Sequence, residues 1–83
     1  MHGIYVLRSK KDGGLYVGYS AKIRERFVEH QKGNVASTKD RRPWEVIYCE
    51  LYKNSRDAMQ RERFLKTGWG RNYIKKILSN TLK

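Results

Sequence analysis

The chain begins with two short segments dominated by β-branched and aromatic residues, over positions 3–8 and 15–19. Such runs are typical of β-strands. The polar stretch between them contains Asp12-Gly13-Gly14, which favours a hairpin turn. If residue 5 is paired opposite residue 16, an assumed register, the hydroxyls of Tyr5 and Tyr16 emerge on the same face of the hairpin.

A helix and a third strand follow the hairpin. Ser20 is a suitable N-cap, and residues 21–32 have the spacing of a helix. Residues 45–52 predict a strand that is apolar on both faces, which is typical of a central position in a sheet. The turn between these two elements contains Arg42-Pro43.

Two further helices complete the predicted order β-β-α-β-α-α. Asn54 or Ser55 caps the first of them, which runs to about Thr67 and is ended by the glycines of Gly68-Trp69-Gly70; the last helix covers residues 71–79. The simplest architecture is a small mixed or antiparallel sheet flanked by helices, in the α+β class with a sandwich-like arrangement of layers. We expect a single domain over residues 1–83.

The charge of the chain indicates the kind of partner that it binds. The 83 residues carry 19 Lys and Arg against 8 Asp and Glu, a net charge of +11. This charge suits a polyanionic partner such as nucleic acid. No apolar run approaches a membrane span, the N-terminus lacks a signal-peptide pattern, and the lone Cys49 fits a reducing compartment, so we expect a cytoplasmic protein without a membrane partner.

The first predicted helix carries polar residues on the face turned toward the sheet. Ile23, Arg26, Phe27 and His30 follow one another at the i, i+3, i+4 and i+7 spacing of a single stripe. Arg26 and His30 therefore point inward or lie along the rim of the core. An arginine in that position needs an anionic partner.

The second predicted helix places Glu62 between the apolar markers Ala58 and Leu65, where a carboxylate is costly unless it is paired or bound to a metal. Two interpretations follow. Arg26 and Glu62 form a buried structural ion pair, with His30 as a satisfied core histidine, or these residues converge with the tyrosines in a reactive site.

A convergent site would suit phosphodiester hydrolysis. Glu62 would hold one Mg²⁺ or Mn²⁺ ion, and the Arg26 guanidinium would form a bidentate hydrogen bond with the phosphate. A tyrosine, with an unperturbed pKa of about 10, would act on the attacking water while His30 accepts or relays its proton. Thiol, zinc and nucleoside-triphosphate chemistry fit less well, because Cys49 has no neighbouring His and no phosphate-binding glycine loop is present.

The same residues resemble a known family. Gly3-Ile4-Tyr5 followed by Tyr16-Val17-Gly18, with Arg26, His30 and Glu62 in matching order, is similar to the small stand-alone members of the GIY-YIG nuclease superfamily, from Gly3 to about Ile77. The resemblance implies a three-stranded antiparallel sheet with flanking helices and hydrolysis of DNA with a single divalent metal. It makes Tyr5 and Tyr16 the motif tyrosines, with Arg26 on the phosphate, His30 beside a tyrosine and Glu62 on the metal.

The chain departs from the family pattern in three places. Val17 replaces the usual isoleucine, a β-branched exchange. The loop over residues 34–38 offers only hydroxyls where some members carry a second histidine. Asn72 is the candidate for an asparagine found beyond the glutamate in many members, at an offset that does not clearly match.

Binding of DNA would rest on this domain's own basic residues, with phosphate-dominated contacts and little sequence preference. The expected contact residues are Lys10, Lys11, Lys39, Arg41, Arg42, Arg61, Arg63, Lys66 and Arg71. Trp44, Trp69 and Tyr19 stack on bases or pack in the core. The expected function is cleavage of branched, nicked or single-stranded DNA in repair or recombination, with a partner protein supplying specificity. The alternatives are a non-catalytic nucleic-acid-binding module and a catalytic module recruited to a repair complex.

Overall fold

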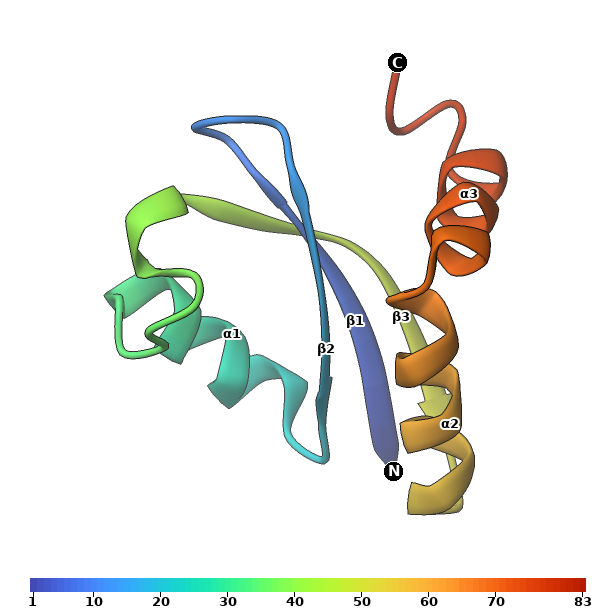
Figure 1. Ribbon diagram of the computed structural model, residues 1–83. Coiled ribbons are helices and arrows are strands. Elements are labelled where there is room, and N and C mark those ends of the chain that lie inside the picture. Colours follow the sequence, from blue (N-terminus) through green and yellow to red (C-terminus); the bar gives the residue numbers. More distant parts are fainter.

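The computed structural model describes residues 1–83 and contains one antiparallel sheet with helices on both faces (Figure 1). The elements in chain order are β1 (His2–Ser9), β2 (Leu15–Ser20), α1 (Ile23–Lys32), the short 3₁₀ helix η1 (Lys39–Arg41), β3 (Trp44–Tyr52), α2 (Ser55–Leu65) and α3 (Gly68–Ile77). This confirms the α+β class, the three antiparallel strands and the order β-β-α-β-α-α. None of the helices is both long enough and apolar enough to cross a membrane.

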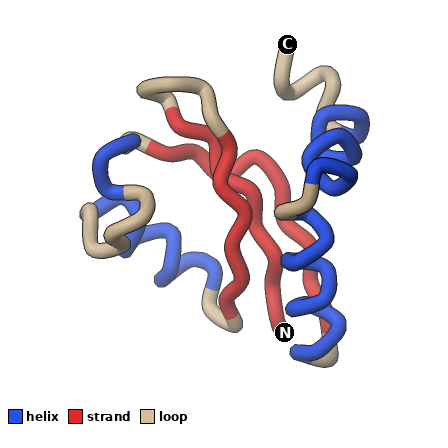
Figure 2. Tube along the Cα trace, viewed as in Figure 1, coloured by secondary structure: helices blue, strands red, loops and turns tan.

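The alternation of side chains along β1 divides the interior into two layers. Ile4 and Val6 pack toward Ala58, Leu65 and Ile74 of α2 and α3. Tyr5 and Leu7 point the other way, into a cluster with Trp44 that Ile23 and Phe27 of α1 cover. Figure 2 shows the strands between α1 on one side and the α2–α3 pair on the other.

The hairpin has a different register from the assumed one. Tyr5 pairs with Gly18 and Leu7 pairs with Tyr16, so the expected pairing of residues 5 and 16 is wrong by two residues. A shift of two residues keeps every side chain on its own face, because strand side chains alternate with a period of two. The two tyrosines therefore still lie on the same face, as predicted.

The central strand is β1 and not β3, since the strand order is β2-β1-β3. The expectation that the third strand is central was wrong because its apolar outer residues are not covered: Val46 is 38% exposed and Leu51 is 60% exposed. In β1, by contrast, residues 3–7 are buried on both faces.

The helix boundaries near the C-terminus also differ from the prediction. Gly68 and Gly70 do not end α2; they belong to the first turn of α3, whose N-cap is Thr67, with its Oγ1 accepting from the backbone N–H of Gly70 at 3.1 Å. A Cβ atom at Gly70 would overlap the backbone of Phe64 and Leu65. The glycine thus lets α3 approach the end of α2 closely rather than breaking a helix.

The other predicted helix starts are confirmed in part. The side chain of Asn54 accepts from the backbone N–H of Arg56 at 2.8 Å and caps α2. Ser20 accepts from the backbone N–H of Lys22 at 2.9 Å, but α1 begins only at Ile23, two residues later than predicted.

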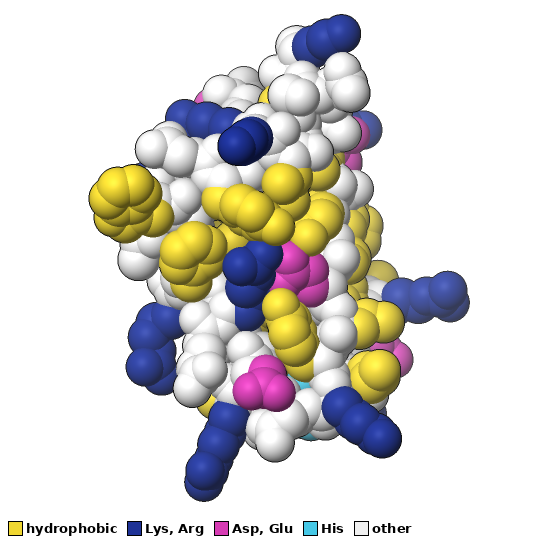
Figure 3. Space-filling view, turned by 90° about the vertical axis from the view of Figure 1, so that its right-hand side faces the viewer, with side chains coloured by type: hydrophobic (Ala, Val, Ile, Leu, Met, Phe, Trp, Pro, Cys, Tyr) yellow, Lys and Arg dark blue, Asp and Glu magenta, His cyan; other side chains and the backbone are white.

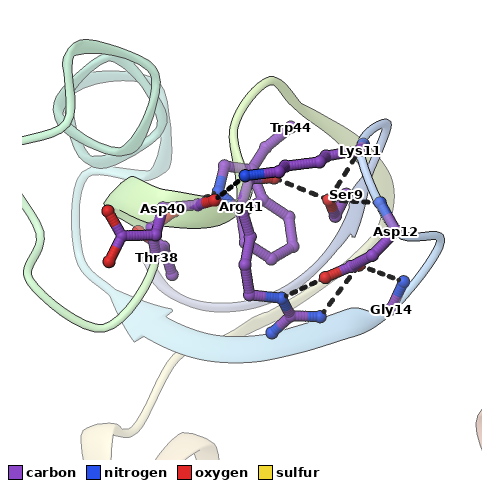
Figure 4. A network of polar contacts seen from close by, with 8 residues as sticks. All are labelled: Ser9, Lys11, Asp12, Gly14, Thr38, Asp40, Arg41 and Trp44. Carbon is purple, nitrogen blue, oxygen red and sulfur yellow. Dashed lines mark hydrogen bonds and ion pairs between the residues drawn. The ribbon is translucent and has the colours of Figure 1, made fainter.

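Polar contacts join the hairpin tip to the segment that precedes β3 (Figure 4). Ser9 donates its hydroxyl to the carbonyl of Arg41 at 2.6 Å and accepts from the backbone N–H groups of Lys11 and Asp12. The carboxylate of Asp12 accepts from Nε of Arg41 at 2.8 Å, and the Arg41 guanidinium lies over the Trp44 ring. The hairpin tip therefore holds this segment in place.

Gln31 and Trp44 tie the end of α1 to the start of β3. The backbone N–H of Trp44 donates to Oε1 of Gln31 at 2.8 Å, and Nε2 of Gln31 donates to the Trp44 carbonyl at 2.9 Å. The indole N–H of Trp44 donates to the carbonyl of Thr38 at 3.0 Å. These bonds fix His30, the neighbour of Gln31, relative to Thr38.

Candidate active site

A chain of hydrogen bonds runs from Tyr5 of β1 to the loop after α1. The Tyr5 hydroxyl lies 2.8 Å from Nε2 of His30, and Nδ1 of His30 lies 2.8 Å from Oγ1 of Thr38. Thr38 donates its hydroxyl to the carbonyl of Val35 at 3.4 Å, so its oxygen is the acceptor for the His30 Nδ1–H. Nε2 is then the unprotonated nitrogen, and it accepts from Tyr5.

Burial keeps both ends of the Tyr5–His30 pair neutral. Tyr5 is 2% exposed and His30 is fully buried. Burial raises the pKa of Tyr5 to about 12, against the opposing influence of Arg26. Burial, and secondly the positive charge of Arg26, lowers the pKa of His30. At neutral pH a phenol therefore faces an imidazole that is free to accept its proton.

Gly18 explains how Tyr5 reaches the edge of the sheet. A Cβ atom at Gly18 would overlap the ring and hydroxyl of Tyr5, which is its pairing partner. The Tyr5 ring therefore crosses directly over the backbone of β2, the edge strand. Only glycine leaves room for this crossing, which gives a physical reason for the last residue of Tyr16-Val17-Gly18.

Tyr16 lies beside this pair without sharing its hydrogen bonds. Its ring centroid is 6.4 Å from that of Tyr5 and 5.2 Å from that of His30. Since Tyr5 and Thr38 engage both nitrogens of His30, the hydroxyl of Tyr16 is not bound to that ring. Tyr16 is only partly buried and is available to a bound molecule.

Arg26 and Glu62 approach the same tyrosine from opposite sides of the sheet. Arg26 is exposed, so of its two expected positions the rim is correct. Glu62 pairs with Lys66 at 3.3 Å and not with Arg26, so the interpretation as a buried Arg26–Glu62 ion pair is wrong. Both charges still influence the pKa of Tyr5, Arg26 lowering it and Glu62 raising it. Arg26 and Glu62 therefore lie near enough to Tyr5 to affect its pKa, beside the rings of Tyr5, Tyr16 and His30.

Glu62 offers a metal a single carboxylate. No group of three or more His, Cys, Asp or Glu side chains is present to hold an ion. The Glu62 side chain is 25% exposed and has one exposed cation, Lys66, as its partner. One accessible carboxylate fits Mg²⁺, which keeps several waters and takes phosphate oxygens as further ligands, and it does not fit a fully enclosed ion.

The predicted DNA-contacting residues fall into two groups. Arg41 is paired with Asp12, and Arg61 with Glu50 at 2.9 Å, so their charges are already neutralised. Several others are exposed and form no ion pair, and Lys66 has only the Glu62 contact; the unpaired ones are Lys10, Lys11, Lys39, Arg42, Arg63 and Arg71. Fewer than the nine predicted contact residues are therefore free of an acidic partner.

Glu50 is the centre of a network that the sequence did not indicate. Its carboxylate accepts from the hydroxyls of Tyr48 at 2.6 Å and Tyr52 at 2.7 Å, and from two nitrogens of Arg61. Burial tends to raise the pKa of Glu50, but the hydrogen bonds from Arg61 and the two tyrosines hold it below its usual value. The Arg61 guanidinium also lies over the ring of Tyr73, so this network joins β3, α2 and α3.

The three aromatic residues considered for base stacking have different surroundings. Trp44 is 1% exposed and is part of the core. Tyr19 is partly buried, and its hydroxyl is 2.8 Å from Nδ1 of His2. Trp69 is 81% exposed and belongs to the α2–α3 side, where apolar and basic side chains are mixed (Figure 3). Of the three, only Trp69 offers a large free ring.

Comparisons with known proteins agree with this geometry. Residues 1–75 match the family described as the GIY-YIG catalytic domain. The chain is 40% identical over 67 residues to the UPF0213 protein SSP2268 of Staphylococcus saprophyticus, covering 80% of each chain. It is 36% identical over 77 residues to the UPF0213 protein SERP0126 of Staphylococcus epidermidis, covering 92% of this chain and 93% of the relative. No solved structure matches. The paired tripeptides, the Tyr5–His30 contact and the match over 75 residues show that the chain belongs to the GIY-YIG catalytic-domain family.

Proposed function

We propose that the protein is a metal-dependent endonuclease that hydrolyses phosphodiester bonds of DNA. The observation that carries the proposal is the hydrogen bond of 2.8 Å between the Tyr5 hydroxyl and Nε2 of His30, at a site that also holds Arg26 and Glu62. A buried tyrosine backed by a neutral histidine can take a proton from water only by passing its own proton on, and this arrangement supplies the acceptor.

The proton path follows from the protonation states of the two residues. A water held at the Tyr5 oxygen attacks the phosphorus and gives its proton to that oxygen, while the original phenolic proton moves to Nε2 of His30. The Nδ1–H of His30 remains bonded to Thr38, so the ring becomes a cation held in place by that bond. Because the pKa of Tyr5 is about 12, the concerted transfer avoids a free phenolate in the buried site.

The remaining groups act on the phosphate. Arg26 donates to its non-bridging oxygens, and Tyr16, whose hydroxyl does not bind His30, donates to a neighbouring oxygen. Glu62 would hold the divalent ion, which stabilises the charge on the phosphate and on the leaving oxygen when bound. Mg²⁺ or Mn²⁺, as one ion, suits a single accessible carboxylate.

The biological setting is part of the same proposal. The net charge of +11 and the family favour a nucleic acid substrate. Within this class we propose branched, nicked or single-stranded DNA met in repair or recombination. A chain of 83 residues has little surface for reading base sequence, so a partner protein would supply specificity.

The test is a cleavage assay with nicked, branched and single-stranded DNA in the presence of Mg²⁺, Mn²⁺ or a chelator. Wild type is compared with Glu62→Ala, Tyr16→Phe and a control, Glu25→Ala, which removes an exposed carboxylate of α1. We expect metal-dependent cleavage by wild type and the control, and its loss in Glu62→Ala with DNA binding retained. Binding without cleavage in wild type would instead identify a non-catalytic nucleic-acid-binding module.

A further inference from the structure

A groove of about 540 Å³ runs beside the edge strand β2, between the hairpin and α3. Its wall on the sheet side is formed by Gly13, Gly14 and residues 15–17. Its opposite wall is formed by the end of α2 and one side of α3. Because β2 is an edge strand, one row of its backbone N–H and C=O groups has no strand partner here.

All the charged residues that line this groove are basic. Lys66, Arg71 and Lys75 line it, and no acidic residue does. Arg71 and Lys75 form no ion pair, and Lys66 has only its exposed contact with Glu62, a type of pair that contributes little to stability. Two unpaired cations and one with a single exposed carboxylate contact are therefore available to a phosphate backbone.

The rest of the lining is apolar and small. Leu15, Val17 and Ile74 contribute hydrocarbon surface, and the two glycines contribute no side chain. A bound molecule would therefore meet cations together with apolar contact surface and accessible backbone. A nucleic acid strand offers the complement of this lining, with charged phosphates alternating with less polar sugars and bases.

The groove is continuous with the candidate active site through two residues. Tyr16 is one of the groove residues on the β2 edge, and its ring packs on the α1 face of the sheet, 6.4 Å from that of Tyr5. Lys66 lines the groove and contacts Glu62. A DNA strand whose phosphate lies at Tyr5 can therefore continue along β2 toward the hairpin tip while it stays in contact with the protein surface.

We infer that this groove binds the backbone of the cleaved strand on one side of the scissile phosphate, through Lys66, Arg71 and Lys75. The inference rests on the proposed function for the position of the scissile phosphate. It distinguishes these three cations from the other basic residues of the surface. It also predicts the path of the bound DNA strand, which runs along β2 toward the hairpin tip.

The experiment measures binding of a short fluorescein-labelled single-stranded oligodeoxynucleotide by anisotropy, in a chelator so that no cleavage occurs, over a series of salt concentrations. The variant K66A/R71A/K75A is compared with K32A/K53A/R56A, which also removes two lysines and one arginine, all exposed and outside the groove. We expect the groove variant to bind at least about tenfold more weakly and to lower the log–log salt slope by about 2, as for three lost phosphate contacts. The control should stay close to wild type.

Equal losses in the two triple variants, or no loss in the groove variant, would overturn the inference. Circular dichroism confirms that both variants are folded. Shortening the oligonucleotide from each end in turn adds a positional test: wild type should lose affinity when the arm in the groove is removed, and the groove variant should be insensitive to that truncation. An absence of cleavage by wild type with any metal counts against the proposed function and leaves these binding results unaffected.

Discussion

The hydroxyl of Tyr5 lies 2.8 Å from Nε2 of His30, although the two residues are 25 positions apart in the chain. One comes from the central strand and the other from the last turn of α1. The pair is buried, yet it lies next to the open edge of the sheet, where Tyr16 of β2 is partly exposed. The buried proton acceptor thereby lies beside the position at which we propose that the phosphate binds.

Removing the Tyr5 hydroxyl should stop cleavage while leaving DNA binding intact. For Tyr5→Phe we expect cleavage to fall by about 10²–10⁴-fold, the range typical of a lost general base. Tyr52→Phe is the matched control, because it removes a phenolic hydroxyl that contacts Glu50, away from the site. Single-turnover cleavage and anisotropy measure the two effects. If the Tyr5→Phe variant cleaved DNA at the wild-type rate, this result would contradict the proton path through Tyr5.

Thr38 is a positioning residue for His30. The variant Thr38→Val keeps the shape but leaves the buried Nδ1–H of His30 without an acceptor, so we expect a loss of about 1–3 kcal/mol of stability. The rate of cleavage should fall and its pH profile should change, because the histidine is no longer held in one tautomer. Thr38→Ser retains the hydroxyl and should restore both. Urea denaturation and a pH–rate profile test this, and an unchanged profile in Thr38→Val would exclude the positioning role.

Gly18→Ala should displace Tyr5. The added methyl group would overlap the ring and hydroxyl of Tyr5, so we expect a destabilisation of about 1–3 kcal/mol and loss of cleavage. Gly68→Ala is the control, because a Cβ atom there meets nothing within 4 Å and Gly68 lies at the start of α3. Thermal denaturation compares the two. Equal stability of Gly18→Ala and wild type would show that the ring does not cross β2 at this point.

The stability of the fold should depend on pH through His30. Burial and Arg26 lower its pKa in the folded protein, so below 6.5, its ordinary value, the unfolded chain binds a proton that the folded protein does not. The contribution of His30 to the free energy of unfolding should therefore be fully present above pH 6.5. It should fall as the pH drops from 6.5 toward the lowered pKa. Tyr5, Tyr16 and Arg26 face the ring and none supplies a negative charge at these pH values.

Urea denaturation at about pH 7.5 and about pH 5.5 brackets this transition. The carboxylates with lowered pKa, Asp12 and Glu50, titrate at lower pH and do not contribute in this window. His30→Gln should reduce stability at both pH values and remove most of the difference between them. The same difference in the variant and in wild type would show that another group is responsible.

Much of the fold could be predicted because its determinants are local. Alternation along residues 3–8 assigned Tyr5 to one face and Ile4 to the other, and the structure confirms this. The register could not be predicted, because a shift of two residues leaves the pattern of faces unchanged. Gly70 was interpreted as a helix breaker because its real reason, close approach to the backbone of α2, depends on tertiary packing.

The identity of the site residues could be predicted better than the contacts that these residues make. Helical spacing predicted that His30 points inward or lies along the rim of the core, and the structure shows that it is fully buried. The same spacing could not distinguish a rim position for Arg26 from a core position, because a long side chain can bend outward. Thr38 was missed as the partner of His30, since nothing in a loop of hydroxyl-bearing residues shows which one faces a ring eight positions earlier.

The free edge of β2 also limits how this protein can associate with itself. Exposed edge strands commonly recruit a further strand, from another molecule or during aggregation. A strand added to β2 would cover Tyr16 and fill the groove, so self-association through this edge and access of a nucleic acid exclude each other. Lys66, Arg71 and Lys75 repel a second copy of so basic a chain while attracting a polyanion. The charges that we propose to bind the substrate thus also oppose self-association at the edge where the sheet is left incomplete.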